Sequence, residues 1–278
     1  MFHARQTMKI GTGFSNAIMV RRGLFLAFAG MLCGTVAMKA GLADSATAAQ
    51  QILSNPVYRA DDYYLGRHNL ANVYTGLGIL QGIVAKDALN YEAWWRIAKF
   101  YNYLARFSNG GKHRIILQQA VTAGEKAVAL QPQRVEGHFW LGASYGLLAE
   151  DSNFLEGLSM VDEIRAEMEA AVKIDPNYEE AAAVIALGRM DYRVPFFKGG
   201  NLQRSVQLLE KSLRLSPDNS LAMLYLADSY RAAGRLNEAR NLLDRILNLC
   251  PDPGYSTEVI QTQTEARKEL SQYFHASR

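Results

Sequence analysis

Histidine is the first residue to examine for chemistry, because its side chain binds metals and transfers protons near neutral pH. The chain has 5 histidines. Neither the His-x3-His spacing nor the glutamate-rich spacing of a zinc site occurs around His68, His113, His138 and His275. His138 stands near a bulky core position of its helix, which favours a packed or capping side chain. The sequence therefore predicts no metal site and no cofactor.

Glycine-rich stretches are the second candidate for chemistry, because they can wrap phosphates. Residues 109–113 read Asn-Gly-Gly-Lys-His, without the Gly-x4-Gly-Lys-Ser/Thr spacing of a phosphate-binding loop, and we expect a loop between two helices there. Gly76, Gly78 and Gly82 follow no strand, so they favour close helix packing over dinucleotide binding. Residues 150–151 are expected in a solvated loop. No nucleophile has an identifiable base, and we predict that the chain is not an enzyme.

The first 43 residues are typical of an export signal. Arg21 and Arg22 precede an uncharged stretch over 23–38 that is too short and too rich in Gly and Ala for a membrane span. Small residues then stand just before Asp44, as a cleavage site requires. We therefore predict a signal peptide over 1–43 and a periplasmic protein. Leu32 stands before Cys33 where a lipid-anchor signal needs a small residue, so no lipid anchor is expected.

Composition and charge after this leader indicate a globular or repeat protein. Hydrophobic residues make up 49% of the chain and charged residues 21%, which is enough to bury a core. Five of the 30 basic residues and none of the 27 acidic residues precede Asp44, so the remainder carries a net charge of −2. That balance argues against a nucleic-acid binder. Only Cys250 remains after the leader, which excludes an intrachain disulfide.

Helical repeats must position any site in this chain. The clearest repeat ends at Pro251, which lies 34 residues after Pro217, the tetratricopeptide period. Within it, apolar residues recur at steps of three and four from Met223 to Tyr230, so they share one helical face. Gly234 then ends the first helix, because glycine tolerates the left-handed cap.

The same frame extends backward through longer repeats. The closing prolines Pro132, Pro176 and Pro217 lie 44 and 41 residues apart, so these units carry insertions of about ten and seven residues between their two helices. Four first helices are expected to start at Tyr91, Val135, Glu179 and Ser220. We predict an all-α, right-handed α-solenoid of tetratricopeptide-like helix pairs with inserted loops. The four repeats span 91–251, between amino-terminal capping helices and a half repeat over 44–90 and a carboxy-terminal capping helix over 252–278.

The motifs in these helices resemble a known family. They are WWRIAKFYNYL, EKAVALQP before GHFWLGASYG, AAVKIDP before IALGR, and VPFFKGGNLQRSVQLLEKSLRLSP, and PFFKGG from Pro195 to Gly200 is the most specific. Their order resembles the T component of tripartite periplasmic TRAP transporters, the TatT family. Eukaryotic regulators of microtubule dynamics are similar over the same helices. The transporter resemblance implies a periplasmic protein that associates with a solute-binding component and encloses an apolar channel or groove.

The first helix of each pair is expected to line a groove. Taking the second, fifth, ninth, twelfth and thirteenth positions keeps one helical face. The predicted ligand- or partner-binding residues are Glu92, Trp95, Lys99, Asn102, Tyr103, Phe139, Leu187, Met190, Leu224, Asp228 and Arg231. The apolar members have two interpretations: they are packed core residues, as aromatic stripes usually are, or they form the wall of a binding site.

Two functions from different classes of binding fit this sequence. The first is a periplasmic interaction module that binds a protein partner, a transporter solute-binding component, and holds an apolar small ligand in the groove. The alternative is a cell-envelope assembly or quality-control adaptor that binds peptide segments. Apolar groove residues favour the first function, whereas a clamp for peptide termini would use Lys99, Asn102 and Arg231.

Overall fold

The computed structural model describes residues 55–250 and 256–274. Every described element belongs to one compact unit, Leu53–Arg278. The expected signal peptide over 1–43 and residues 44–54 of the expected amino-terminal cap lie outside the described residues. No helix of the described residues has the length and apolar character needed to cross a bilayer.

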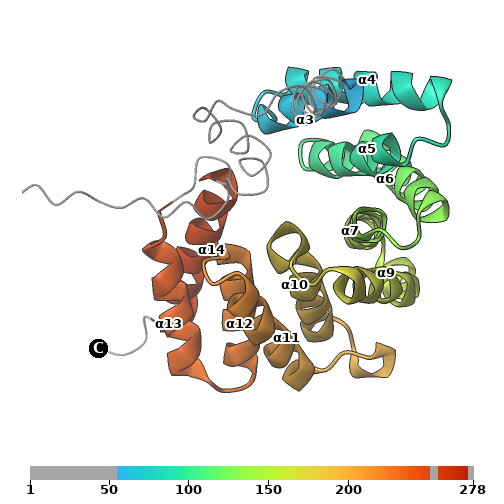
Figure 1. The fold of residues 1–278 in the computed structure, drawn as a ribbon. Helices are drawn as coiled ribbons and strands as arrows, with labels where there is room; N and C mark the ends of the chain where they lie inside the picture. The colour runs from blue at the N-terminus through green and yellow to red at the C-terminus, as the bar shows by residue number, and fades with distance from the viewer. Residues whose placement is uncertain (1–54, 251–255, 275–278) are drawn as a thin grey trace, which may run out of the picture. The chain divides into compact units, whose positions relative to one another are not determined.

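The described residues form twelve α-helices and one 3-10 turn. In chain order these are α3 (Pro56–Leu65), α4 (Leu70–Lys86), α5 (Tyr91–Ala105), α6 (Gly110–Leu130), α7 (Val135–Asp151), α8 (Phe154–Ser159), α9 (Val161–Ile174), α10 (Tyr178–Arg193), η1 (Phe196–Lys198), α11 (Leu202–Leu215), α12 (Ser220–Ala232), α13 (Leu236–Leu247) and α14 (Ser256–Phe274). Within this unit the helices follow one another around an arc, with the first helices α5, α7, α10 and α12 on its inner side (Figure 1). The predicted all-helical solenoid is confirmed.

Polar side chains at the helix ends explain where the helices begin and stop. Asn55, Asn90 and Asn219 each accept a hydrogen bond from a backbone N–H in the first turn that follows, which satisfies one of the free donors there. Gly234 ends α12 with φ +75, and the next residue, Arg235, donates from its N–H to Tyr230 O at 2.8 Å. This is a Schellman cap, as predicted for that glycine.

Each helix packs mainly on its neighbours along the chain, so the core is a row of small clusters. Phe100 and Leu80 are fully buried between α4 and α5, and Leu209, Leu226 and Leu243 are buried where α11, α12 and α13 of the last two repeats meet. Burial of each such side chain stabilises the fold by about 1.5 to 3 kcal/mol. The first pair is complete, because α3 packs on α4 where the sequence predicted only half a repeat.

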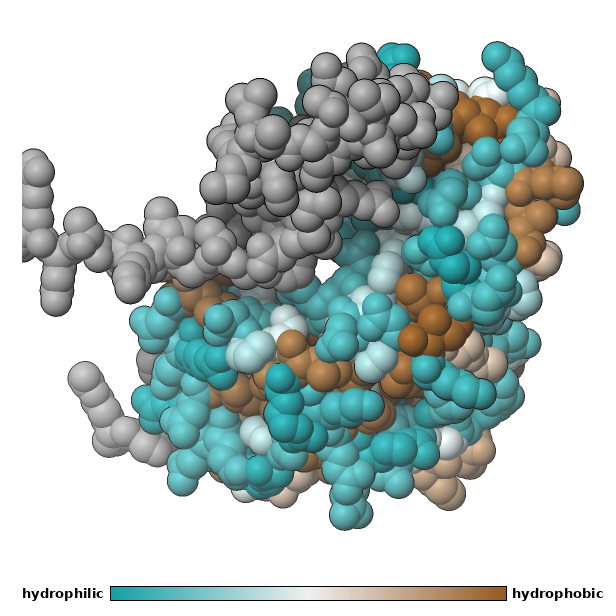
Figure 2. Space-filling view, in the orientation of Figure 1, coloured by the Kyte–Doolittle hydropathy of each residue, from teal (hydrophilic) through white to brown (hydrophobic). Residues whose placement is uncertain are grey.

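The two longer repeats hold their extra residues between their helices, as predicted. The first insertion contains α8, and the second contains η1 with the PFFKGG motif. Their apolar side chains face solvent: Phe154 and Leu155 are 68% and 75% exposed, and Phe196 and Phe197 are 86% and 64% exposed. Figure 2 shows hydrophilic residues over much of the visible face, with apolar patches between them.

A buried carboxylate holds the second insertion in place. Asp191 at the end of α10 is inaccessible to solvent and pairs with Arg165 of α9 and with Arg204 of α11. Both guanidinium groups also donate to Gly199 O. Gly199 has φ +85, and a Cβ on Gly200 would lie 1.7 Å from the backbone oxygen of Val194. Both glycines of the motif are therefore structural.

Two predicted loops are helical instead. Residues 110–113 form the first turn of α6, and residues 150–151 form the last turn of α7. Sequence reasoning missed both because Gly and Asp are weak helix formers in isolation, whereas packing against neighbouring helices decides the outcome here. Of the three spaced glycines in α4, Gly76 is buried against Phe100, while Gly78 and Gly82 are exposed.

Candidate functional site

The first helices share a half-exposed stripe that we call the inner face. Its side chains recur at steps of three and four and are partly buried, so each helix presents one side at the edge of its core cluster. The residues of the inner face are Lys99 and Tyr103 on α5, Trp140 and Ala143 on α7, Ala182, Ala186, Arg189 and Tyr192 on α10, and Tyr225 on α12.

Lys99 is the centre of the first half of this face. Its Nζ lies 2.9 Å from Glu179 Oε1 of α10, 4.6 Å from the ring centroid of Tyr64 and 5.2 Å from that of Trp140. Trp140 Nε1 in turn donates to the hydroxyl of Tyr178 at 3.1 Å. Burial raises the pKa of the Tyr64 and Tyr178 hydroxyls, so both stay protonated at neutral pH. One ammonium group thus joins four helices through aromatic rings and one carboxylate.

The carboxylate that meets Lys99 comes from an unusual turn. Glu179, Glu180 and Ala181 have φ of 46, 59 and 62, so the first turn of α10 contains three consecutive left-handed residues. Each such residue costs about 1 to 2 kcal/mol relative to the right-handed helix. Glu180 accepts from Asn219 Nδ2 at 3.2 Å at the start of the next repeat. The turn therefore points one glutamate backward to α5 and the other forward to α12.

Arginines and tyrosines form the second half of the inner face. Arg189 Nη1 donates to Asp228 Oδ2 at 2.6 Å, and its guanidinium lies 4.2 Å from the ring centroid of Tyr225 and 5.2 Å from that of Tyr192. Arg231 donates to the other oxygen of Asp228 at 3.0 Å. Asp228 therefore pairs with two arginines, and each of them is stacked on an aromatic ring, Arg231 on that of Tyr273 at 4.1 Å.

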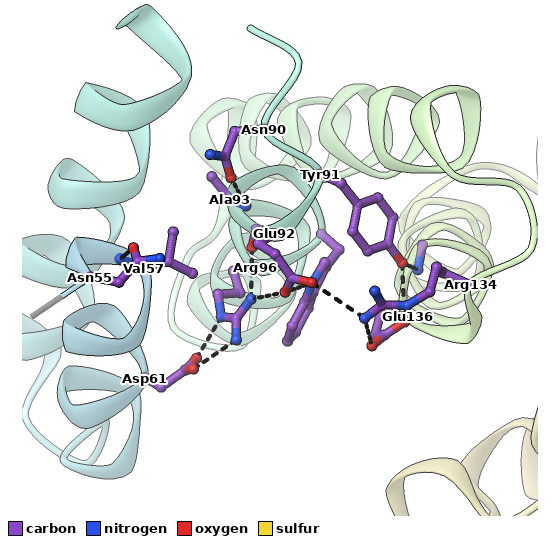
Figure 3. A network of polar contacts seen from close by, with 12 residues as sticks. Asn55, Val57, Asp61, Asn90, Tyr91, Glu92, Ala93, Arg96, Arg134 and Glu136 are labelled. Carbon is purple, nitrogen blue, oxygen red and sulfur yellow. Dashed lines mark hydrogen bonds and ion pairs between the residues drawn. The ribbon is translucent and has the colours of Figure 1, made fainter. Parts of the chain in front are cut away.

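A charged network joins α3, α5 and α7 beside the inner face (Figure 3). Arg96 is only 5% exposed, and it donates to both carboxylate oxygens of Asp61 at 2.9 Å and to Glu92 at 2.6 Å. Glu92 also accepts from Arg134, which pairs with Glu136. Burial by itself would raise the pKa of Glu92, but the hydrogen bonds from Arg96 and Trp95 lower it below its ordinary value. Every charge in this network has a partner, so we assign it to helix positioning.

The structure places some of the predicted binding residues on or beside the inner face and buries the others. Lys99 and Tyr103 lie on the inner face, Asp228 and Arg231 lie beside it, and Glu92 belongs to the charged network. Asn102 is buried and donates to Ser144 Oγ of α7 at 2.8 Å. The others are packed in the core with exposures of 5% to 9%, which fits the packing interpretation of Trp95, Phe139, Leu187, Met190 and Leu224.

Sequence reasoning missed Trp140, Tyr178, Arg189 and Tyr225, which lie next to residues that it named. On α10 the helix begins at Tyr178, one residue before the predicted start at Glu179, so each position counted from that start falls about 100° too far around the helix. The half-exposed aromatic and basic residues would have been found by testing neighbouring frames for a stripe of Tyr, Trp, Lys and Arg.

One trio of side chains has the composition of a catalytic triad. Ser108 Oγ lies 2.9 Å from His113 Nδ1, and His113 Nε2 lies 3.6 Å from Asp151 Oδ1. However, Ser108 Oγ donates to Ala105 O at 3.0 Å, and His113 Nδ1 also lies 3.0 Å from this oxygen. A ring nitrogen that faces a carbonyl oxygen carries the proton, so it does not act as the base for Ser108. These residues cap the end of α5.

Comparison with solved structures shows the same fold in tetratricopeptide repeat proteins. A thermophilic TPR protein of Thermus thermophilus aligns over 78% of this chain and 98% of its own, with 18% identity and a TM-score of 0.58. PilW, a type IV pilus biogenesis factor, aligns over 82% and 96% of the two chains (19%, TM-score 0.54), and PilF of Pseudomonas aeruginosa over 80% and 95% (17%, TM-score 0.51). At these identities the likeness is one of fold.

Family comparison covers nearly the whole described chain. Residues 196–257 match a tetratricopeptide repeat family, and scaffolds of this kind generally bind protein partners without catalysing a reaction. No curated protein matches the sequence. Residues 58–198, half of the chain, match the family described as Regulator of microtubule dynamics protein 1-3. The chain therefore belongs to the family of regulator of microtubule dynamics proteins 1-3, built as a tetratricopeptide-type scaffold.

Proposed function

We propose that this chain is an exported scaffold that binds a protein partner on the inner face of its first helices. The composition of that face carries the proposal. Tyrosine, tryptophan and arginine are the residue types that dominate binding energy at protein interfaces. Here Tyr103, Trp140, Tyr192 and Tyr225 stand half-exposed beside Lys99 and Arg189.

Rigid presentation supports the same proposal. Lys99, Arg189 and Arg231 are held by carboxylates and rings of the chain itself, so little side-chain freedom remains to be lost on binding. The large apolar side chains beneath the face are already packed, which favours a polypeptide partner over an apolar small ligand. We propose the solute-binding component of a periplasmic transporter as the partner, in line with the TatT resemblance.

An envelope adaptor that binds peptide segments is the second candidate. Its support is the paired Lys99 and Glu179 beside the ring of Trp140, since a polypeptide backbone and its side chains can exchange hydrogen bonds with both charges. Structural neighbours include pilus biogenesis factors, although the likeness to them is one of fold.

Affinity capture from an envelope extract, followed by mass spectrometry, separates these candidates. One folded solute-binding protein in stoichiometric amount would support the transporter role, and many peptide segments from outer-envelope proteins would support the adaptor. The decisive variant is the swap Lys99→Glu with Glu179→Lys, which keeps the ion pair while reversing the charges that a partner meets. A second variant, Tyr103→Ser with Tyr192→Ser, removes two rings of the inner face.

The matched control is Tyr74→Ser, because Tyr74 is 60% exposed on α4, outside the inner face. We expect both inner-face variants to lose most of the captured partner and the control to retain it. The swap also removes the contacts of Lys99 with the rings of Tyr64 and Trp140, and the serine variant removes the stacking of Tyr103 on Tyr64, so each should cost roughly 1 to 2 kcal/mol, and capture is compared at a temperature where every variant remains folded. Equal capture by parent, swap and double serine variant would remove the inner face as the binding surface. Export is tested separately, by amino-terminal sequencing of the mature protein, which we expect to begin at Asp44.

A further inference from the structure

Helix α14 connects the last repeat to the first helix pair. Near its start, Glu258 Oε1 lies 3.4 Å from Arg106 at the end of α5 and 3.8 Å from Arg67 between α3 and α4. Near its other end, the ring of Tyr273 stacks against Arg231 of α12, with 4.1 Å between guanidinium carbon and ring centroid. Docking of α14 therefore connects the last repeat to the first helix pair and closes the arc of helices.

An unsatisfied carboxylate lies where α14 meets α12. Glu269 is half-buried, and its Oε2 is buried without a hydrogen-bond partner. It faces Asp228 and Arg231 of α12, Arg189 of α10 and Glu265 of its own helix. Both oxygens of Asp228 already accept from the two arginines, at 2.6 and 3.0 Å. Arg231 Nε is also buried without a hydrogen-bond partner. An ionised Glu269 would thus be a second carboxylate at this site, buried at Oε2 without a hydrogen bond, and the charges of Arg231 and Arg189 offset only part of its lost solvation.

The contacts between α14 and α13 are apolar or neutral. Helix α13 meets α14 with apolar side chains, as Leu243 and Ile246 share a core cluster with Ala266. Gln263 of α14 donates to two backbone oxygens at the end of α13. These contacts carry no charge on either side, so they hold α14 equally whether Glu269 is protonated or ionised.

We propose that α14 is a pH-operated closing helix, docked on α12 while Glu269 is protonated and loosened when Glu269 ionises. Burial, with the charge of Asp228, raises the pKa of Glu269 from 4.5 to about 7. The docked state therefore holds a proton that the released state gives up. Docking is strongest below pH 4.5, weakens as pH rises to about 7, and is constant above that value.

The consequence is a pH-dependent access to the inner face. Loosening of α14 uncovers Arg231 and separates Glu258 from the first helix pair, so the arc can open when Glu269 is ionised. This inference concerns α14 alone, and it holds or fails without any binding partner.

Hydrogen–deuterium exchange of the full chain tests the proposal, with peptides that cover Ala266–Phe274 compared at each pH with the same free peptide. Proton linkage predicts that the opening constant rises roughly twentyfold between about pH 5.5 and 7.5 and less than about twofold from there to about pH 8.5. Peptides from α12 serve as the internal reference for global unfolding.

Three variants make the result specific. Glu269→Gln and Glu269→Ala are both neutral and should abolish the pH dependence, and the glutamine variant should stay protected at about pH 7.5. The control is Glu265→Gln, because Glu265 lies on the same helix and is exposed beside Lys268, and this variant should retain the pH dependence of α14 opening. Equal opening of the parent at the two ends of this pH range would overturn the proposal, as would a parental pH dependence in both Glu269 variants.

Discussion

Adjacent glycines in the PFFKGG insertion should respond very differently to alanine. Gly199 has φ +85, but a Cβ there would meet only the end of the Arg165 side chain, at 3.6 Å. Gly199→Ala should therefore cost about 1 to 2 kcal/mol, the strain of a left-handed residue. A Cβ on Gly200 would lie 1.7 Å from Val194 O, which belongs to the backbone and moves only with the loop.

Relief of that clash breaks two hydrogen bonds, from Gly200 N to Pro195 O at 3.1 Å and from Asn201 N to Asp191 O at 2.8 Å. Each bond contributes about 0.5 to 1.5 kcal/mol and the overpacking about 1 to 3 kcal/mol, so we expect about 2 to 6 kcal/mol for Gly200→Ala. In a domain of this size each kcal/mol lowers Tm by roughly 2 to 4 °C. Urea unfolding with equal m-values measures both variants. A Gly199→Ala variant less stable than Gly200→Ala would refute the reasoning.

Three further expectations follow from packing and charge. Asp191→Asn should destabilise the chain by about 2 to 3 kcal/mol in urea, less than the usual loss for a broken buried pair because Arg204 is 45% exposed and can turn to water. The hydrogen bond to Glu167 raises the pKa of His138, so the stability that this pair contributes is full below pH 6.5 and is lost as pH rises through the raised pKa. The free energy of unfolding of the parent should therefore fall with pH above 6.5, and His138→Asn should remove this dependence. Phe139→Ala should cost about 3 to 5 kcal/mol through the cavity it leaves, whereas Tyr192→Ser on the inner face should cost less than about 1 kcal/mol, and comparable losses in denaturant would contradict this division.

The fold was largely predictable because each repeat carries its own boundary signals. Spaced prolines mark the ends of the second helices, and the apolar steps of three and four place the first helices at Tyr91, Val135 and Ser220, where the structure has them. The two insertions follow from the longer spacings alone. Few arrangements of these helices were then possible, since each helix pair buries its apolar face only on its neighbours.

On α10 the site was less predictable because a helix turns by about 100° per residue, so the frame that is late by one residue exchanges face and core. On α7 and α12 the predicted starts are right, and the difficulty lies in neighbouring residues of similar type. Phe139 and Trp140 are both aromatic, and only the packing of α9 and α10 decides that the first is buried and the second half-exposed. The left-handed turn at Glu179 has no signal in its residue types, which are ordinary helix formers. In the structure, Glu179 and Glu180 of this turn bond to Lys99 and Asn219 of other helices, contacts that no local sequence pattern encodes.

Glu258 bears on how the chain unfolds. A linear array of repeats frays from its ends, because each terminal repeat has a neighbour on only one side. Here the carboxylate of the last helix meets Arg67 and Arg106 of the first repeats, so each end of the array has a second contact. Loss of either end then removes a contact from the other, so fraying of one end is expected to increase the fraying of the other.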